Sequence, residues 1–248
     1  MIAQRRRVYL LDVEGTIAPI SLVSEQLFPY ARRHFPNFLM QNIDDPAVRA
    51  DLRMLSVENC AETDAAAPRM PNVVWTDYVD GPLFRDHASI YALWLMDRDR
   101  KSTALKSLQG KIWKAGFESG ELKGTLFADV PAALERWAAR GRVAIYSSGS
   151  VEAQQLLFRH SVFGDLTGLI AGHFDTRTGA KMESASYAAI AAAMSAAPEE
   201  LLFLSDVGRE LDAAREAGCE TRLVTREGNA PVEDPHGHRI IDSFEGLL

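Results

Sequence analysis

The sequence of 248 residues contains only two cysteines, Cys60 and Cys219, which lie far apart in the chain. That number is too small for a disulfide scaffold, and the wide separation does not match the paired spacing of zinc ligands. We therefore expect two inert thiols in a protein of a reducing compartment.

Long hydrophobic runs are missing as well. The longest charge-free run, Ser184 to Pro198, is mostly Ala and Ser and stays below the roughly 18 apolar residues that a membrane span requires. Near the N-terminus, the apolar segment Val8 to Leu11 already ends at Asp12, which is too short for the core of an export signal. The sequence thus predicts a cytoplasmic, soluble protein with no membrane partner.

Positive charge is in deficit, because 27 Lys and Arg residues face 34 Asp and Glu residues, for a net charge of -7. Binding to nucleic acid depends on clustered positive charge, so a nucleic-acid partner is not expected. The overall balance of 47% hydrophobic and 25% charged residues is that of a soluble globular protein. At this length the chain can form one large domain or two small ones.

Short apolar runs rich in β-formers predict the strands of a parallel sheet. They are Val8 to Leu11, Val143 to Tyr146, Leu201 to Leu204 and Thr221 to Thr225, with a weaker candidate near Leu169 to Ala171. Helical patterns alternate with these runs: one begins with Asp129 as its cap and ends at Gly141, and another stops at Gly218. The alternation predicts an α/β fold, a doubly wound, Rossmann-like parallel sheet with helices on both faces.

Two further segments can be interpreted from their composition. The Ala-rich segment Ala188 to Ala197 is expected to form a helix, because Ala is the best helix former. The Pro-rich tail around His236 and His238 is expected to be a loop.

The stretch from about Pro19 to Lys123 interrupts the alternation of strands and helices. Its apolar residues recur at helical spacing, as in Ile90, Leu93 and Trp94, and it contains no convincing pair of strands. We therefore expect a core domain of residues 1–18 and 124–248, and a helical cap of residues 19–123 inserted after the first strand. Residues 61–71 are expected to form a loop within this insertion.

Polar residues that can carry chemistry follow the predicted strands. The first strand is followed by Asp12-Val13-Glu14-Gly15-Thr16, the second by Ser147-Ser148-Gly149-Ser150 and a later one by Ser205-Asp206, while Lys181 precedes the helix between them. In an open parallel sheet, ligands bind outside the carboxyl ends of the strands, where the strand order reverses. Carboxylates, hydroxyls and a lysine that meet there suit phosphoryl transfer.

The chemical reason is that a carboxylate can attack phosphorus only if the repulsion between the two anions is neutralised. A divalent cation and a lysine can provide that neutralisation. Asp12 and Asp206 supply hard oxygen ligands of the kind that Mg²⁺ prefers.

Each of these residues also has a simpler explanation when taken alone. An Asp at a strand end commonly caps a turn, a Ser-Ser-Gly segment commonly starts a helix, and a lysine such as Lys181 is commonly solvated. Their joint occurrence, in order and each at the appropriate end of its element, favours a catalytic site. For Glu210, four residues after Asp206, two interpretations stay open: it steadies the waters of a metal ion, or it is a solvated acid in the first turn of a helix.

These motifs resemble those of the haloacid dehalogenase superfamily of aspartate-nucleophile phosphatases, and within it those of the enolase-phosphatases, also called acireductone synthases. The first motif of that superfamily normally carries Asp at both acidic positions, whereas Glu14 occupies the second position here, as is typical of the enolase-phosphatases. The resemblance covers nearly the whole chain and is weakest over about residues 32–85. It extends through residues 99–113, 146–154, 172–175, 205–207 and 228–230.

The resemblance implies a metal site with one Mg²⁺ per subunit. Asp12 would be both the nucleophile and a metal ligand. Glu14 would offer a metal-binding oxygen, which in the superfamily is usually the backbone carbonyl, and Asp206 would complete the ligands that the protein supplies.

The resemblance also implies how the substrate is bound. Ser147 and Ser148 would hold phosphate oxygens. Lys181 would pair with the phosphate and with Asp12, and its positive charge would oppose their mutual repulsion. Asp12, Glu14 and Lys181 are thus the predicted catalytic residues.

The implied activity is that of a bifunctional, monomeric enolase-phosphatase of methionine salvage. It would enolise 2,3-diketo-5-methylthiopentyl-1-phosphate and then remove phosphate, to release the acireductone 1,2-dihydroxy-3-keto-5-methylthiopentene. One alternative is a general Mg-dependent phosphatase of small metabolites with the same fold, which would not need Glu14 or the block Arg100-Lys101. The other is a non-catalytic phosphometabolite sensor, which would not need the nucleophile Asp12.

Glu14 is expected to act in the enolisation, the first of the two steps of the implied reaction. A simple alkyl phosphate leaves as a basic alkoxide and needs a well-placed acid, whereas the leaving oxygen of an enolised diketone belongs to a delocalised enediol. Glu14 is then free to assist proton movement in the enolisation. The alternative is that Glu14 serves only as metal scaffold and general acid.

Overall fold

The protein is described here by a computed structural model that covers residues 7–71 and 82–247. The chain divides into two compact units. The sheet unit comprises the described residues up to Ser24 and from Gly120 onward, and the helical unit comprises Glu25–Ser119. The predicted boundaries were residues 18 and 123, and the assignment of the two units as core and cap stays a prediction.

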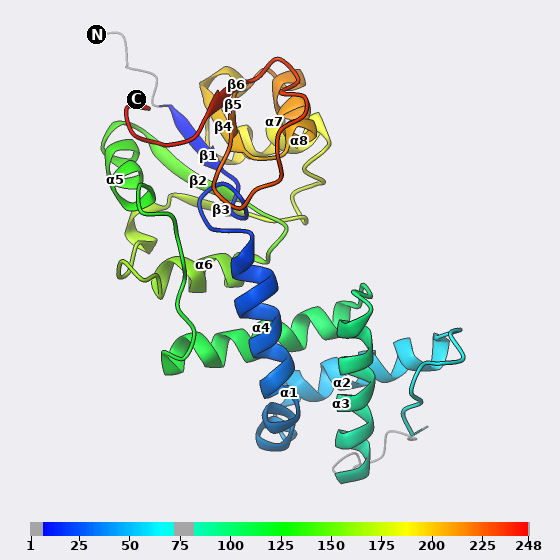
Figure 1. Ribbon diagram of the computed structural model, residues 1–248. Coiled ribbons are helices and arrows are strands. Elements are labelled where there is room, and N and C mark those ends of the chain that lie inside the picture. Colours follow the sequence, from blue (N-terminus) through cyan, green and yellow to red (C-terminus); the bar gives the residue numbers. More distant parts are fainter. Residues whose placement is uncertain (1–6, 72–81, 248) are drawn as a thin grey trace. The chain divides into compact units, whose positions relative to one another are not determined.

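The sheet unit contains a six-stranded sheet in the order β3-β2-β1-β4-β5-β6, and every neighbouring pair is parallel (Figure 1). Short apolar runs form its central strands because they are covered on both faces, so that nearly every residue is buried. The predicted doubly wound α/β fold is confirmed. The strands are β1 (Val8–Leu11), β2 (Arg142–Tyr146), β3 (Gly172–Phe174), β4 (Leu201–Ser205), β5 (Glu220–Val224) and β6 (Arg239–Ile241).

Helices α5 (Val130–Arg140) and α6 (Val151–Arg159) lie on one side of the sheet, and α7 (Ser184–Ala193) and α8 (Gly208–Glu216) lie on the other (Figure 1). Strand β1 contributes to both layers because successive side chains point to opposite faces. Tyr9 stacks on Trp137 of α5 with ring centroids 5.0 Å apart. Val8 and Leu10 join a buried cluster that includes residues of α7 and α8. Two 3-10 helices, η2 (Thr167–Leu169) and η3 (Pro198–Glu200), connect these elements.

Two local predictions were wrong in position. The weak strand predicted near residues 169–171 begins at Gly172, because the 3-10 helix η2 extends to Leu169 and the chain becomes extended only after it. The Ala-rich helix ends at Ala193 rather than continuing to residue 197, and Ser195 follows in a left-handed conformation with φ of +50°. Residues 235–238, around His236 and His238, form no helix or strand, as predicted. The residues that follow form the short edge strand β6, which pairs with β5.

Asp129 precedes α5, as the sequence predicts, but its side chain does not cap the helix. Its carboxylate accepts hydrogen bonds from Phe244 N (2.7 Å) and Arg226 Nη1 (2.9 Å) instead. Gly141 ends α5, and Gly218 follows α8 with φ of +98°, as expected for glycine after a helix. The Asp129 prediction failed because partners distant in sequence compete for the same carboxylate.

In the described residues of the helical unit, four α-helices pack around a hydrophobic core of their own. The apolar residues of each helix recur at helical spacing, and the buried ones include Phe35, Leu52, Tyr91 and Leu108, one from each helix in turn. Residues 62–71 form no helix or strand, in agreement with the predicted loop. The helices are α1 (Phe28–Asn42), α2 (Pro46–Ala61), α3 (Pro82–Asp97) and α4 (Thr103–Ser119), and the π-helix η1 (Leu22–Leu27) leads into α1.

Both cysteines are free, with Cys60 exposed and Cys219 buried. Among the helices of the described residues, none is long and apolar enough to cross a membrane.

Candidate active site

The candidate site lies at the carboxyl edge of the sheet, where β1 lies between β2 and β4. Leu11, the last residue of β1, is level with Ile145 of β2 and with Leu204 of β4. The residues that follow these three strands therefore emerge side by side at one edge. They include Asp12 after β1, Ser147 after β2 and Asp206 after β4.

Asp12 is 3% exposed, and both of its carboxylate oxygens are engaged. Oδ1 accepts from the backbone N–H of Val13 (2.7 Å) and lies 2.6 Å from Lys181 Nζ. Oδ2 accepts from the hydroxyl of Ser205 at 3.1 Å. The Asp12 carboxylate is thus buried, oriented and directly paired with a cation.

Lys181 is held between two carboxylates. Its Nζ lies 2.6 Å from Asp12 Oδ1 and 2.8 Å from Glu210 Oε2. Tyr187 donates its hydroxyl proton to the backbone carbonyl of Lys181 at 2.7 Å, and the ring of Tyr146 lies 5.9 Å from Nζ. Burial alone would lower the pKa of Lys181, but the charges of Asp12 and Glu210 raise it well above its ordinary value. The ammonium group therefore stays charged at physiological pH.

Glu210, in the first turn of α8, is buried and faces this pair. Its Oε2 pairs with Lys181 Nζ and lies 3.1 Å from the Ser205 hydroxyl. That hydroxyl also lies 3.1 Å from Asp12 Oδ2, and its single proton can be donated to only one of the two carboxylates at a time. Burial, and then the negative charge of Asp12, raises the pKa of Glu210. These contacts contradict the interpretation of Glu210 as a solvated acid, since it is buried and paired with Lys181. A role for Glu210 toward the waters of a metal ion stays a prediction.

Asp206 and Glu14 are two acidic residues near Asp12, and both have raised pKa values. Burial, together with the charge of Asp12, raises the pKa of Asp206 to about 7. The same two causes, in the same order, raise the pKa of Glu14. Lys181 lowers both pKa values, although by less than burial and Asp12 raise them. The site therefore favours the binding of positive charge.

The donor set fits a hard divalent cation. The predicted ligands are the carboxylates of Asp12 and Asp206 and the backbone carbonyl of Glu14, which are all oxygens. Among the described residues, no group of three or more His, Cys, Asp or Glu side chains is arranged to hold a metal ion. The predicted set does not require one, because only two of its oxygen donors come from side chains.

Gly15 makes the close approach of the two strand ends possible. It has φ of +69°, and a Cβ atom there would lie 2.1 Å from Asp206 Oδ2. The turn that it belongs to is closed by hydrogen bonds from the N–H groups of Ile17 and Ala18 to Val13 O, at 3.0 and 2.9 Å. A side chain at this position would displace the Asp206 carboxylate.

The two serines predicted to bind phosphate follow β2. Ser147 is buried, and its hydroxyl oxygen accepts from Gly149 N at 3.0 Å, so its proton is available to another acceptor. Ser148 is exposed. Ser150 accepts from Ala153 N at 3.2 Å and caps α6, so this residue supports the helix. Ser147 and Ser148 thus follow the strand that pairs with β1, and their binding of phosphate stays a prediction.

Three residues of the site region had no role in the sequence analysis. Ser205 bridges Asp12 and Glu210, as described above. Asn229 and Arg226 follow β5 and bind the turn after β1, since Asn229 Nδ2 donates to Gly15 O (2.8 Å) and Arg226 Nε donates to Thr16 O (3.1 Å). The family motifs at residues 205–207 and 228–230 include Ser205 and Asn229 without indicating their contacts, and Arg226 lies in neither motif.

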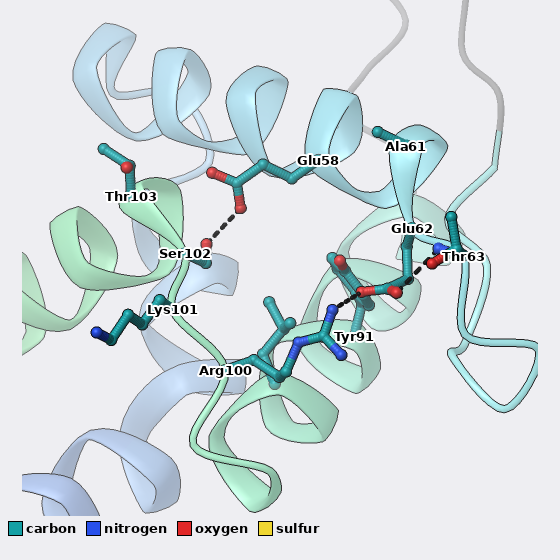
Figure 2. A pocket seen from close by; sticks show the side chains of 10 residues that line it. Glu58, Ala61, Glu62, Thr63, Tyr91, Arg100, Lys101, Ser102 and Thr103 are labelled. Carbon is teal, nitrogen blue, oxygen red and sulfur yellow. Dashed lines mark hydrogen bonds and ion pairs between the residues drawn. The ribbon is translucent and has the colours of Figure 1, made fainter.

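The helical unit contains a separate pocket of about 380 Å³, formed where α2, α3 and α4 end or begin (Figure 2). Glu62 pairs with Arg100 at 2.8 Å, and Glu58 accepts from the hydroxyl of Ser102. Lys101 points away from the Glu62–Arg100 pair in Figure 2. Both residues of the block Arg100-Lys101 line this pocket.

Comparison with known proteins agrees with this geometry. Residues 7–218 match the family of haloacid dehalogenase-like hydrolases. The chain is 52% identical to enolase-phosphatase E1 of Synechococcus elongatus over 225 residues, which cover 90% of each chain. The chain belongs to the enolase-phosphatase E1 family of haloacid dehalogenase-like hydrolases. The predicted family is thereby confirmed.

Two other relatives extend the comparison. Enolase-phosphatase E1 of Danio rerio is 42% identical, with 99% of this chain and 96% of that protein covered. The crystal structure of the UTR4 protein from Saccharomyces cerevisiae superposes with a TM-score of 0.77 at 37% identity, covering 98% of this chain and 100% of that chain. Membership of the enolase-phosphatase E1 family therefore extends over both units of the chain.

Proposed function

We propose that the protein is a Mg²⁺-dependent enolase-phosphatase that converts 2,3-diketo-5-methylthiopentyl-1-phosphate to the acireductone and phosphate in methionine salvage. The observation that carries the phosphatase step is the buried Asp12 carboxylate paired with Lys181 at 2.6 Å, at the sheet edge where ligands bind. The choice of substrate is supported by identity to proteins named enolase-phosphatase E1.

Asp12 is the proposed nucleophile. Its carboxylate oxygen forms a bond to phosphorus while the bond from phosphorus to the substrate oxygen breaks, which leaves an acyl phosphate on Asp12. Water then cleaves the acyl phosphate, releases inorganic phosphate and restores the carboxylate. Lys181 opposes the repulsion between Asp12 and the phosphate, and Ser147 and Ser148 donate hydrogen bonds to phosphate oxygens.

Asp12, Asp206 and the backbone carbonyl of Glu14 are the proposed ligands of one Mg²⁺. Haloacid dehalogenase-like hydrolases are generally metal-dependent. When bound, the ion would supply positive charge between the nucleophile and the phosphate. We also propose that the sheet unit is the catalytic core, that the helical unit is the cap, and that the protein acts as a cytoplasmic monomer.

Glu14 is the proposed group for proton movement in the enolisation. Burial and the nearby charge of Asp12 raise its pKa, which brings the carboxyl group closer to the pH at which an acid–base catalyst works best. The Glu14 carboxyl group can then take part in acid–base chemistry while its backbone carbonyl stays available to the metal ion.

The test is a phosphate-release assay with the diketo phosphate, with and without Mg²⁺, together with ultraviolet absorbance of the enol. Mg²⁺-dependent release preceded by the enol signal is expected, and Asp12→Asn should reduce release by several orders of magnitude. Turnover of Asp12→Asn within about tenfold of wild type would exclude Asp12 as nucleophile. Release from many phosphate esters but not from the diketo phosphate would indicate a general phosphatase, and binding without release a sensor.

A further inference from the structure

We propose that Asn229 is a positioning residue that holds Asp206 for the cation and sets its distance from the turn after β1. This inference rests on the proposed function only through the Mg²⁺ ion. Asn229 lies after β5, outside the set of residues assigned to the metal or the substrate.

Asn229 connects the two strand ends that supply the proposed metal ligands. Its side-chain Nδ2 donates to the backbone carbonyl of Gly15 at 2.8 Å and to Asp206 Oδ2 at 3.4 Å. Gly15 directly follows Glu14, whose own backbone carbonyl is a proposed ligand. One amide group thus contacts both the turn after β1 and the carboxylate after β4.

The orientation of this amide is fixed by its surroundings. Both of its contacts, Gly15 O and Asp206 Oδ2, are acceptors, so only the NH₂ side can face them. The other atom, Asn229 Oδ1, is buried and has no hydrogen-bond partner among the described residues. The side-chain hydrogen bonds of Asn229 in the described structure thus go to Gly15 and Asp206, and we infer that these two contacts fix the position of the amide.

The turn at Gly15, the Asp206 carboxylate and the Asn229 amide are close together, so a shift of the amide would move the carboxylate. A Cβ atom on Gly15 would lie 2.1 Å from Asp206 Oδ2 and 3.1 Å from Asn229 Nδ2, so these three groups touch one another. A donor on Asp206 Oδ2 stabilises the carboxylate and restricts its rotation, as outer partners of metal ligands do.

The experiment compares Mg²⁺ binding by wild type, Asn229→Ala and a matched control, Asn42→Ala. Asn42 is also half-buried and donates Nδ2 to one backbone carbonyl, that of Phe38 at 2.9 Å, but it lies in α1 of the helical unit. Calorimetry should give a Kd for Mg²⁺ that is about 10 to 100-fold higher in Asn229→Ala. In Asn42→Ala the Kd should stay within about twofold of wild type. Phosphate release by Asn229→Ala should recover as the Mg²⁺ concentration is raised.

A Kd of Asn229→Ala within about twofold of wild type overturns the proposal, and so does a loss of activity that saturating Mg²⁺ does not restore. Circular dichroism and thermal unfolding without Mg²⁺ establish that the variants are folded. If Asn229→Ala does not fold, Asn229→Gln replaces it, because a longer side chain moves the amide away from both acceptors, and the same Kd criterion applies.

The outcomes separate this proposal from the proposed function. If wild type binds Mg²⁺ but does not release phosphate from the diketo phosphate, the function is wrong and the comparison of Kd values still decides the role of Asn229. If wild type does not bind Mg²⁺, the positioning role is overturned as well.

Discussion

At the scale of single residues, the central feature is Lys181 between Asp12 and Glu210. An ammonium group with two carboxylate partners is held in one place, and each partner loses orientation when the other is removed. The Lys181–Glu210 pair is buried, so its contribution is not screened as it would be at the surface.

Glu210→Gln should reduce phosphate release by about 10 to 100-fold, the range expected for the loss of a partner that orients a catalytic group. The Gln side chain is neutral, so Lys181 keeps the negative charge of Asp12 beside it and loses that of Glu210. Glu216→Gln is the matched control, because Glu216 is exposed at the end of the same helix. Steady-state turnover of both variants is the measurement. Equal turnover of Glu210→Gln and Glu216→Gln would contradict the orienting role.

Glu14→Gln separates the two proposed steps, because it removes the ionisable group and keeps the backbone carbonyl. Appearance of the enol phosphate should slow far more than hydrolysis of enol phosphate that has already formed. The two rates are followed by ultraviolet absorbance and by phosphate release. If both steps slow equally, Glu14 is an ordinary acid for the leaving group and the enolisation role is wrong.

At the scale of elements, the turn after β1 depends on Gly15. In Gly15→Ala the new Cβ atom would meet Asp206 Oδ2, and the left-handed conformation would cost about 1 to 2 kcal/mol in addition. We expect a lower thermal midpoint and loss of Mg²⁺ binding and phosphate release.

Gly246→Ala is the control for the backbone term. Gly246 has φ of +73°, close to that of Gly15, and no atom within 4 Å of the position of a Cβ. Its thermal midpoint should fall by about 2 to 8 °C at unchanged activity, since about 1 kcal/mol shifts the midpoint of a chain of this size by about 2 to 4 °C. If Gly15→Ala and Gly246→Ala lower the thermal midpoint equally and both keep full activity, the close approach of Asp206 to Gly15 is not needed for Mg²⁺ binding or phosphate release.

The anchor between α5 and the C-terminal segment depends on the charge of Asp129. Burial alone would raise the pKa of Asp129, but hydrogen bonds from Phe244 N and from Arg226 hold it below its ordinary value of 3.8. A group with a lowered pKa in the folded state contributes stability above the unfolded pKa, and this stability is lost as the pH falls through the folded pKa.

Asp129→Asn should therefore lower the free energy of unfolding by about 3 kcal/mol at pH 7, because it leaves the buried Arg226 without its anion. The difference from wild type should shrink below pH 3.8, where Asp129 becomes protonated. Denaturant titrations at neutral and acid pH measure both quantities. A difference that is constant with pH would show that the ionised form of Asp129 is not what stabilises the fold.

At the scale of the whole molecule, the thiols report on the folded state. Cys219 is 6% exposed, and burial, with a smaller effect of Glu199, raises its pKa to about 12. A thiol reagent should therefore titrate Cys60 alone in the native protein and both cysteines after unfolding. Rapid reaction of both thiols in the native protein would contradict the packing of Cys219 against the sheet.

Sequence patterns were sufficient for the features that depend on neighbours along the chain. Apolar runs at strand length, helical spacing in residues 19–123 and glycine after α8 are local signals, and the strands and helices form close to where these signals lie. The positions of Asp12, Ser147 and Asp206 at one edge also followed, because the carboxyl ends of parallel strands must share an edge.

Contacts between distant segments could not be derived in this way. The local sequence does not indicate that Asp129 pairs with Arg226 instead of capping α5. It also does not indicate the hydrogen bonds that Asn229 donates to Gly15 and Asp206. They depend on which side chains meet once β4 has paired with β1 and β5 has paired with β4. Chain order and periodicity thus specify the helices, the strands and the edge of the sheet at which the candidate site lies. Tertiary packing decides which group pairs with each buried charge. The reason is that a buried carboxylate needs a hydrogen-bond donor, and only the folded structure determines which donors lie next to it.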